Sequence, residues 1–251
     1  MILRIQEASA ANTKSNTTTR INPLEEADLG GVDCDICNNT GYVVRRDENG
    51  VDWSRECVCM KARRSKRSLR NSGLADMVTR YTFLNYKTPN RECEKIKAKA
   101  IRFCDEPEGW FYISGQPGSG KTHICTAICN EFIKQGRSLK YMLWRDESVP
   151  LRALMTDQEA YADKMYKLKT IPVLYIDDFL KCKGDPTPAE LNLAFELING
   201  RYNNEKLRTI ISTERSIENV LDFDEALGSR IYEKSKGYCL SAPHENWRMR
   251  Q

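Results

Sequence analysis

A short loop from Gly115 to Thr122 carries the residues with the most specific chemistry in this 251-residue chain. It reads G-x-x-x-x-G-K-T, and glycines let backbone N–H groups crowd around a phosphate chain because no Cβ stands in the way. We expect Lys121 to reach the outer phosphates and the hydroxyl of Thr122 to hold Mg²⁺. The residues expected to bind a nucleotide here are Gly115, Pro117, Gly118, Ser119, Gly120, Lys121 and Thr122.

The flanks of this loop favour a nucleotide site over the alternative, a flexible surface loop. Residues 110–114 are short and apolar, as a buried strand should be. Residues 123–135 carry apolar side chains at helical spacing, and Gly136 follows as a helix C-cap. The positive end of that helix faces the expected phosphates. Strand, glycine-rich loop and helix together form the context that this chemistry needs.

Two adjacent carboxylates end a second apolar run, 173–178. We expect Asp177 to hold Mg²⁺, directly or through water, and Asp178 to polarise the water that attacks the nucleotide. The carboxyl end of a buried parallel strand opens onto the ligand crevice of its sheet, which suits both roles. The alternative is that the two acids only cap the following turn.

Four cysteines near the start of the chain have the spacing of a metal site: Cys34, Cys37, Cys57 and Cys59. Between the two pairs, residues 42–46 and 51–55 alternate like strands around the turn residues 47–50. A hairpin would bring four thiolates together, which is the ligand set of structural Zn²⁺. The alternative is buried or free thiols, although so small a module needs a staple to fold.

The rest of the chain indicates an α/β fold with a central, mostly parallel sheet flanked by helices. Strands are expected at 110–114, 139–144, 172–177, 208–212 and 237–240. One strand comes between the loop helix and the acid-ended strand and another follows it, as in ATPases with an extra strand between the two nucleotide-binding strands. Thr187, Pro188 and Glu190 predict a capping box, followed by an apolar core stripe at Leu191, Ala194, Phe195 and Ile198.

Composition excludes several classes of protein. Forty per cent hydrophobic residues, 29% charged residues and a net charge of +4 are ordinary for a globular protein, and the weak positive charge alone does not establish nucleic-acid binding. No apolar run is long enough for a membrane span, and the N-terminus lacks a signal core. We therefore expect a cytoplasmic protein with no membrane partner, whose ten cysteines are not disulfides.

Three further motifs complete an ordered set: Ile211-Ser212-Thr213-Glu214, Gly228-Ser229-Arg230-Ile231 and Asn246-Trp247-Arg248. With the loop and the paired acids, they resemble the AAA+ ATPases of bacterial and phage replicative helicase loaders, the DnaC/DnaI type. The resemblance extends from about Cys34 to Trp247. It implies an AAA+ domain, preceded by a small zinc-binding β-hairpin module of the kind that loaders use to contact the helicase.

The resemblance also implies roles for single residues. Residues 212–214 occupy the sensor I segment, where loaders often carry Asn at the position of Glu214, and Thr213 is favoured as the sensing residue. Arg230 resembles the arginine finger that stabilises charge on the ATP of a neighbouring subunit, the alternative being a surface arginine at a helix start. Arg248 resembles the sensor II arginine, with Arg250 as a near neighbour.

Four regions are expected along the chain: a flexible segment at 1–33, the zinc module at 34–60, a basic helical linker at 61–80 and the ATPase domain at 81–251. The basic residues of the linker could contact phosphates, form a solvated helical face or meet an acidic partner.

The leading functional hypothesis is an ATP-dependent loader, which self-associates, grips single-stranded DNA and places a DnaB-type replicative helicase on it. Its cofactors are ATP, Mg²⁺ and Zn²⁺. One alternative is an IstB-like ATPase that assists DNA transposition. The other is a nucleotide-gated adaptor that scarcely hydrolyses ATP.

Overall fold

The computed structural model describes residues 34–47, 49–78 and 80–249, except for the side chain of Arg248. The segment 1–33 and Arg250 lie outside the described residues, so the expected flexible segment stays a prediction.

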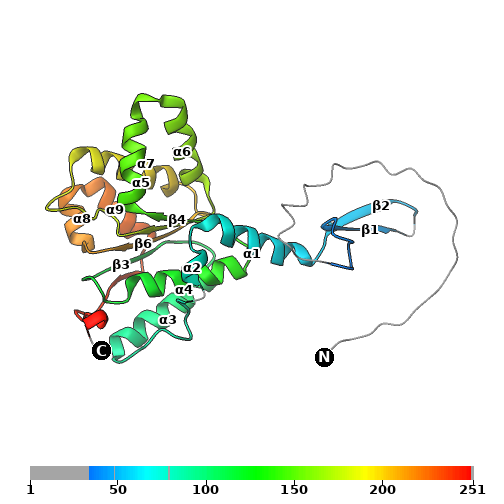
Figure 1. Ribbon diagram of the computed structural model, residues 1–251, viewed down its shortest axis with the longest axis horizontal. Coiled ribbons are helices and arrows are strands. Elements are labelled where there is room, and N and C mark those ends of the chain that lie inside the picture. Colours follow the sequence, from blue (N-terminus) through cyan, green and yellow to red (C-terminus); the bar gives the residue numbers. More distant parts are fainter. Residues whose placement is uncertain (1–33, 48, 79, 250–251) are drawn as a thin grey trace.

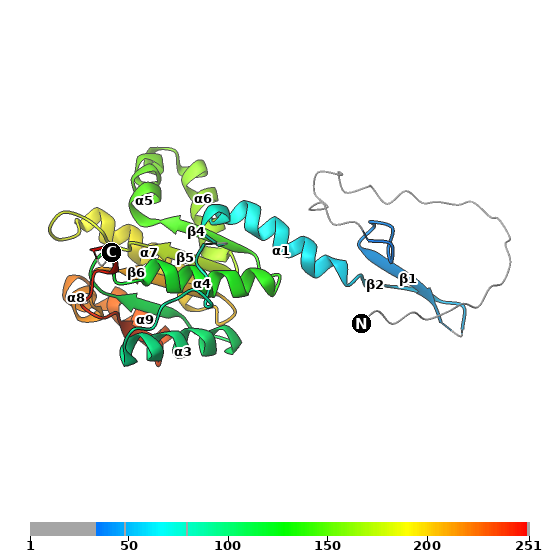
Figure 2. The same ribbon diagram turned by 60° about the horizontal axis from the view of Figure 1, so that its bottom comes forward.

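A five-stranded sheet forms the centre of the larger part of the molecule (Figures 1 and 2). Its order is β4-β5-β6-β3-β7, and all neighbouring strands run parallel. The strands are β3 (Phe111–Ser114), β4 (Leu139–Leu143), β5 (Val173–Asp177), β6 (Arg208–Thr213) and β7 (Cys239–Ser241). All five expected strands are therefore present, within one or two residues at each end. In the sheet, β6 lies between β3 and β5. The extra strand expected between the two nucleotide-binding strands is therefore present.

Helices cover both faces of this sheet, and each face has its own apolar cluster. Alternation along β3 explains the division, since Phe111 and Ile113 join one cluster and Tyr112 joins the other. The first face is covered by α1 (Cys59–Ser72), α2 (Ala75–Val78), α3 (Arg91–Asp105) and α4 (Lys121–Lys134). The second is covered by α5 (Trp144–Ala153), α6 (Gln158–Thr170), α7 (Pro188–Tyr202), α8 (Ile217–Phe223) and α9 (Glu225–Lys234). None of the described helices has the length and apolar character to cross a membrane.

The start of α7 confirms the expected capping box. The Thr187 hydroxyl accepts from the Glu190 amide, and the Glu190 carboxylate accepts from the Thr187 amide. The apolar stripe behind it is turned slightly from the expected one: Leu193 and Leu197 are buried, whereas Leu191 and Phe195 are only partly buried. The buried strip that faces the sheet therefore consists of Leu193, Ala194, Leu197 and Ile198, and the partly buried Leu191 and Phe195 pack beside it.

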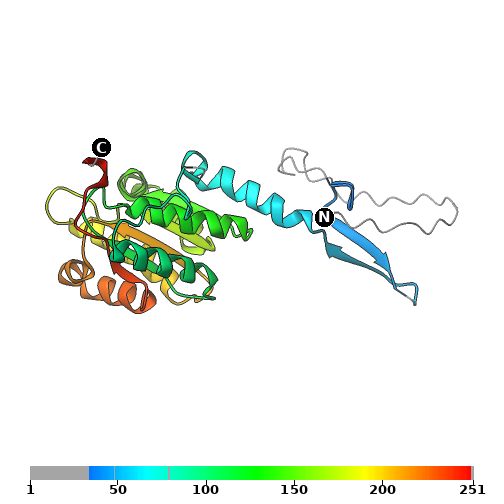
Figure 3. The ribbon, with the colours of Figure 1, turned by 90° about the horizontal axis from the view of Figure 1, so that it is seen from below.

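The cysteine module stands apart from the sheet, and α1 connects the two (Figures 1 and 3). Strands β1 (Tyr42–Arg46) and β2 (Asp52–Glu56) form the antiparallel hairpin expected from the sequence. The far end of α1 is fixed to the ATPase side, because the Ser68 hydroxyl donates to the Arg137 carbonyl at 2.9 Å and accepts from the Leu139 amide at 3.1 Å. The expected boundaries between module, linker and ATPase domain stay predictions.

A fully buried arginine ties α7 to the strand β6 and to the end of α6. Arg201 donates to the carbonyl oxygens of Leu168, Ile171 and Arg208 and to the Thr209 hydroxyl, at 2.7–3.0 Å. Burial lowers its pKa to about 9, so the guanidinium stays charged at neutral pH. Sequence reasoning missed this residue because nothing local marks an arginine as buried.

We expect Arg201→Met to destabilise the fold by about 3–5 kcal/mol, because several buried acceptors lose their donor. Urea unfolding followed by tryptophan fluorescence measures this. The matched control is Arg102→Met, whose exposed side chain forms only a surface ion pair with Glu106 and should change stability by less than about 1 kcal/mol. Equal midpoints for the two variants would contradict a structural role for Arg201.

Candidate functional site

The glycine-rich loop connects the carboxyl end of β3 to the start of α4, as expected. Gly118 and Gly120 have φ of 80° and 90°, a left-handed conformation that favours glycine, and Gly120 is the N-cap of α4. A Cβ on Gly118 would collide with the Asn246 side chain. The Trp247 amide also donates to the Gly118 carbonyl at 3.0 Å. The motif near the C-terminus therefore lies against the loop.

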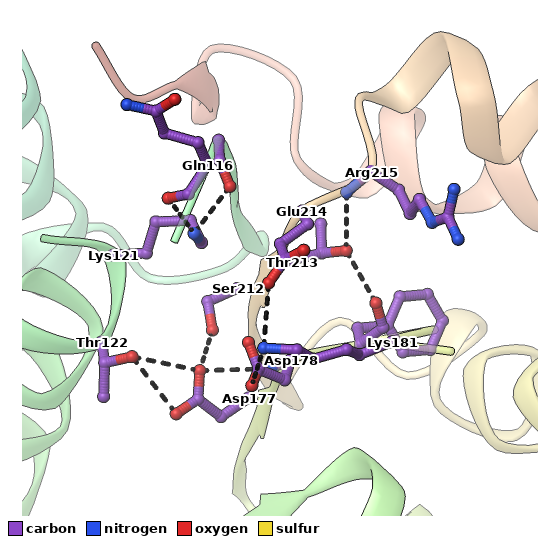
Figure 4. A network of polar contacts seen from close by, with 12 residues as sticks. Gln116, Lys121, Thr122, Asp177, Asp178, Lys181, Ser212, Thr213, Glu214 and Arg215 are labelled. Atoms are coloured by element: carbon purple, nitrogen blue, oxygen red, sulfur yellow. Dashed lines mark hydrogen bonds and ion pairs between the residues drawn. The ribbon is translucent and has the colours of Figure 1, made fainter. Parts of the chain in front are cut away.

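Lys121 is buried and turned back onto this loop (Figure 4). Its Nζ donates to the carbonyl oxygens of Gly115 at 2.7 Å and Gln116 at 2.9 Å. Burial lowers the pKa of Lys121, while the nearby carboxylates of Glu214, Asp178 and Asp177 oppose that shift. The ammonium group thus lies within the loop that is expected to hold the phosphates.

The two expected Mg²⁺ ligands meet although 55 positions separate them. The Thr122 hydroxyl lies 3.4 Å from each carboxylate oxygen of Asp177, and the Asp177 side chain is buried. Asp177 also accepts hydrogen bonds from Ser212 and from Tyr141, the latter at 3.2 Å. In phosphate sites Mg²⁺ is bound by carboxylate and hydroxyl oxygens. Asp177 and Thr122 supply one group of each kind, so the residues present fit this cation.

Asp178 begins a tight turn after β5. Its φ is +54°, and Leu180 has the same value, which is uncommon for residues other than glycine. The turn brings Lys181 back to its own start: the Lys181 Nζ lies 2.9 Å from Asp178 Oδ2 and 2.9 Å from Glu214 Oε1. Figure 4 shows this ammonium group between the two carboxylates. Sequence reasoning gave Lys181 no role, although its spacing of three residues from Asp178 was a usable signal.

The side chains at the end of β6 face different ways, which bears on the sensor I role predicted for Thr213; that role stays a prediction. Thr213 is fully buried and its hydroxyl donates to the Phe179 carbonyl at 2.7 Å, away from the acids of the site. Ser212 in β6 donates to Asp177, and Glu214, directly after the strand, pairs with Lys181, so both lie toward the acids of the site. The geometry therefore favours Ser212 and Glu214 over Thr213.

Arg230 lies within α9, where it packs on α7 of the same chain. Its Nε donates to Asn199 Oδ1 at 3.1 Å, and its guanidinium lies over the Phe195 and Tyr202 rings at 5.0 and 5.5 Å. The residue is thus inside a helix, not at its start, and its expected contact with a neighbouring subunit stays a prediction. The role expected for Arg248 stays a prediction as well, because its side chain is outside the described residues.

The four cysteines of the hairpin module converge on one point. Cys34 and Cys57 have sulfur atoms 3.7 Å apart, Cys37 and Cys59 have theirs 3.6 Å apart, and all four sulfurs lie within 4.8 Å of one another. A tetrahedral zinc site with Zn–S bonds of about 2.3 Å has sulfur–sulfur edges of about 3.8 Å, so the four thiols fit Zn²⁺. These separations are too long for disulfides.

Local hydrogen bonds favour a thiolate in this cluster. Burial raises the pKa of Cys37, but the Gly41 amide and the neighbouring thiols bring it down to about 7. Burial and the neighbouring thiols raise the pKa of Cys59 to about 12, and the charge of the buried Arg63 of α1 only partly opposes this; Arg63 also donates to Asn39 Oδ1 at 2.9 Å. The helix that leads to the ATPase side therefore also supports the cluster.

A parallel sheet of this order, with a glycine-rich phosphate loop and a carboxylate pair at its carboxyl edge, defines a P-loop nucleotide-binding protein of the AAA+ class. Residues 49–239 match the family model of the IstB-like ATP binding protein. The chain belongs to this family of ATP-binding proteins.

Individual relatives agree with the resemblance drawn from the motifs. The chain is 32% identical over 228 residues to the phage-like element PBSX protein XkdC of Bacillus subtilis (strain 168), covering 86% of this chain and 84% of that protein. It is 24% identical over 184 residues to the replicative helicase loader DnaC of Escherichia coli (strain K12), covering 70% and 71%. A crystal structure of the DnaC helicase loader superimposes with a TM-score of 0.55 at 25% identity, covering 66% of this chain and 98% of that one.

Proposed function

We propose that this protein is an ATP-dependent loader that places a DnaB-type replicative helicase on single-stranded DNA. The observation that carries the proposal is the meeting of Lys121, Thr122, Asp177 and Asp178 at one edge of a sheet with the fold of a helicase loader. The cysteine hairpin that precedes the ATPase part supports a loader, because it provides a separate module for holding a partner.

Each residue of the site has a defined task in ATP hydrolysis. The amides of the loop and the Lys121 ammonium bind the phosphates, and Thr122 and Asp177 hold the metal. When bound, Mg²⁺ neutralises charge that develops on the phosphates. Asp178 orients the attacking water and accepts its proton. Ser212 keeps the Asp177 carboxylate in place through its hydrogen bond.

Self-association is part of this proposal, with Arg230 completing the site of a neighbouring subunit. We expect Arg230→Ala to retain ATP binding and to lose at least about tenfold in DNA-stimulated turnover, because a guanidinium no longer stabilises the reacting phosphate. Malachite-green phosphate release measures this. Mixing Arg230→Ala with Lys121→Ala subunits should restore part of the activity, since each subunit supplies what the other lacks.

Two results would contradict the role of Arg230 in a neighbouring site. One is normal hydrolysis by the Arg230→Ala protein. The other is lost hydrolysis that mixing does not restore and that accompanies a large fall in thermal stability, because Arg230 also packs on Phe195 and Tyr202. The control is Lys234→Ala, which removes another cation from the same helix and the same Tyr202 ring.

A transposition helper is the second candidate, because the matching family model is named after the IstB-like proteins. Co-purification separates the two candidates. The tagged chain, with ATP and without it, is incubated with a purified hexameric replicative helicase and with a transposase. ATP-dependent capture of the helicase supports the loader, and capture of the transposase without the helicase supports the helper.

Hydrolysis is tested separately, because an adaptor could bind ATP without turning it over. Steady-state phosphate release is measured with single-stranded DNA for the wild type and for Asp178→Asn. A loader that hydrolyses ATP should lose about 100-fold or more in rate in the variant. Equal, near-zero rates in both proteins would support the adaptor.

A further inference from the structure

Lys181 stands between two carboxylates of the candidate nucleotide site, and the function proposed above gives it no task. Its ammonium nitrogen is 2.9 Å from an oxygen of Asp178 and 2.9 Å from an oxygen of Glu214. Hydrogen bonding to Glu214 is the largest of the effects that raise the pKa of Lys181, so the side chain is charged at every physiological pH. The two acids come from different strands, and Lys181 is the group that joins them.

The backbone fixes Lys181 in this place. The left-handed conformations at Asp178 and Leu180 fold the chain into a turn in which the Lys181 amide donates to the Asp178 carbonyl at 3.1 Å. Phe179 and Leu180 are buried and anchor the turn in the core. The Phe179 amide also donates to the Ser212 carbonyl at 2.9 Å, which ties the turn to β6. Two strained residues at a reaction site are a costly arrangement that indicates a functional constraint.

The charged groups at this edge of the sheet indicate what the constrained turn at Lys181 achieves. The described residues at this edge include three carboxylates, those of Asp177, Asp178 and Glu214, against the ammonium groups of Lys121 and Lys181. Among these acids, Glu214 has the largest electrostatic effect on Lys121, the residue expected to hold the outer phosphates. A bare Glu214 carboxylate so near would repel a γ-phosphate. Lys181, placed between Glu214 and Asp178, removes one of the two negative charges that these carboxylates would otherwise present.

We propose that Lys181 is a positioning residue of the ATP site, which rests on the function proposed above. It offsets the negative charge of Glu214 so that the γ-phosphate can approach, and it holds the Asp178 carboxylate in the orientation that water activation needs. The first task concerns the affinity for ATP but not for ADP, since only ATP carries a γ-phosphate. The second concerns turnover at saturating ATP.

Four variants test these two tasks: Lys181→Met, Lys181→Arg, Lys181→Met combined with Glu214→Gln, and the control Lys183→Met, an exposed lysine of the same loop. Equilibrium titration gives the Kd for Mg·ATP and Mg·ADP, and phosphate release gives kcat. We expect Lys181→Met to weaken ATP binding by about tenfold and ADP binding by less than about threefold, and to lower kcat at least about tenfold. Lys181→Arg should retain most of each activity. The combined variant should recover ATP affinity but not kcat.

Distinct outcomes would overturn the proposal. An unchanged ATP-to-ADP affinity ratio and kcat in Lys181→Met would remove both tasks. Equal losses for ATP and ADP, with a lower unfolding midpoint, would reduce Lys181 to a structural residue. A combined variant that does not recover ATP affinity would disprove that Lys181 acts by offsetting the charge of Glu214. If the wild-type protein binds neither nucleotide, the proposed function itself fails; if it binds both and Lys181→Met behaves like Lys183→Met, only this inference fails.

Discussion

Replacing Lys121 with alanine is expected to weaken ATP binding by about 100-fold or more, since the loop loses its charged donor to the outer phosphates. The fold should survive this change. Lys121 is buried without a direct ion pair, and its partners are the carbonyl oxygens of Gly115 and Gln116, which remain at the loop surface for water to reach. Titration with a fluorescent ATP analogue measures the affinity, and thermal unfolding checks the fold.

The control for this experiment is Lys134→Ala, at the other end of the same helix. Lys134 is exposed and forms a surface ion pair with Glu131, so its loss should leave ATP binding unchanged and stability within about 1 kcal/mol. ATP affinity that is the same in Lys121→Ala and Lys134→Ala would count decisively against a nucleotide site in this loop, and the loader proposal would be withdrawn with it.

Purified protein is expected to contain about one zinc ion per chain, and Cys57→Ser is expected to lose it. Four thiolates bind structural zinc with about 10–16 kcal/mol of free energy, and a hydroxyl in place of one thiolate forfeits much of that affinity. Since the hairpin has only a small apolar cluster around the cysteines themselves, loss of the metal should unfold it. Elemental analysis measures the metal, and limited proteolysis between β1 and β2 measures the unfolding.

Cys182→Ser is the matched control for the zinc experiment, because Cys182 is a half-buried thiol outside the cluster. It should keep the metal and resist proteolysis like the wild type. ATP binding should be retained in both variants, since the cluster and the phosphate loop are separate. A Cys57→Ser protein that kept a full equivalent of zinc would remove the four-thiolate site.

Much of this arrangement could be predicted because it depends on local order along the chain. A strand followed by G-x-x-x-x-G-K-T and a strand ending in Asp177 and Asp178 must both open at the carboxyl edge of a parallel sheet, so the meeting of Thr122 with Asp177 followed from the spacing. The hairpin followed in the same way from alternation on both sides of a turn.

The other features of the site and fold depend on contacts between residues that are far apart in the sequence. Thr213 and Glu214 differ by one residue, and which of them faces the site is decided by the pairing of β6 with β5, which the sequence of β6 alone does not fix. Lys181 reaches Asp178 only because two residues other than glycine adopt positive φ, against their usual preference. Arg201 can be buried because carbonyl groups from the end of α6 and from β6 converge on it, and no local pattern records that convergence.

The helix α1 begins at Cys59, one of the four clustered thiols, and ends against β4. Near its start it passes Gly136, just beyond the C-terminal end of α4. This glycine leaves room for Lys61 and Arg64 of α1. A 14-residue helix is about 21 Å long, so a tilt of 10° at one end displaces the other by about 4 Å. If α4, which starts at Lys121, shifted together with the phosphate loop, the contact near its far end would pass that shift to α1 and displace the cysteine hairpin. Such a shift would connect the occupancy of the phosphate loop with the position of the cysteine module.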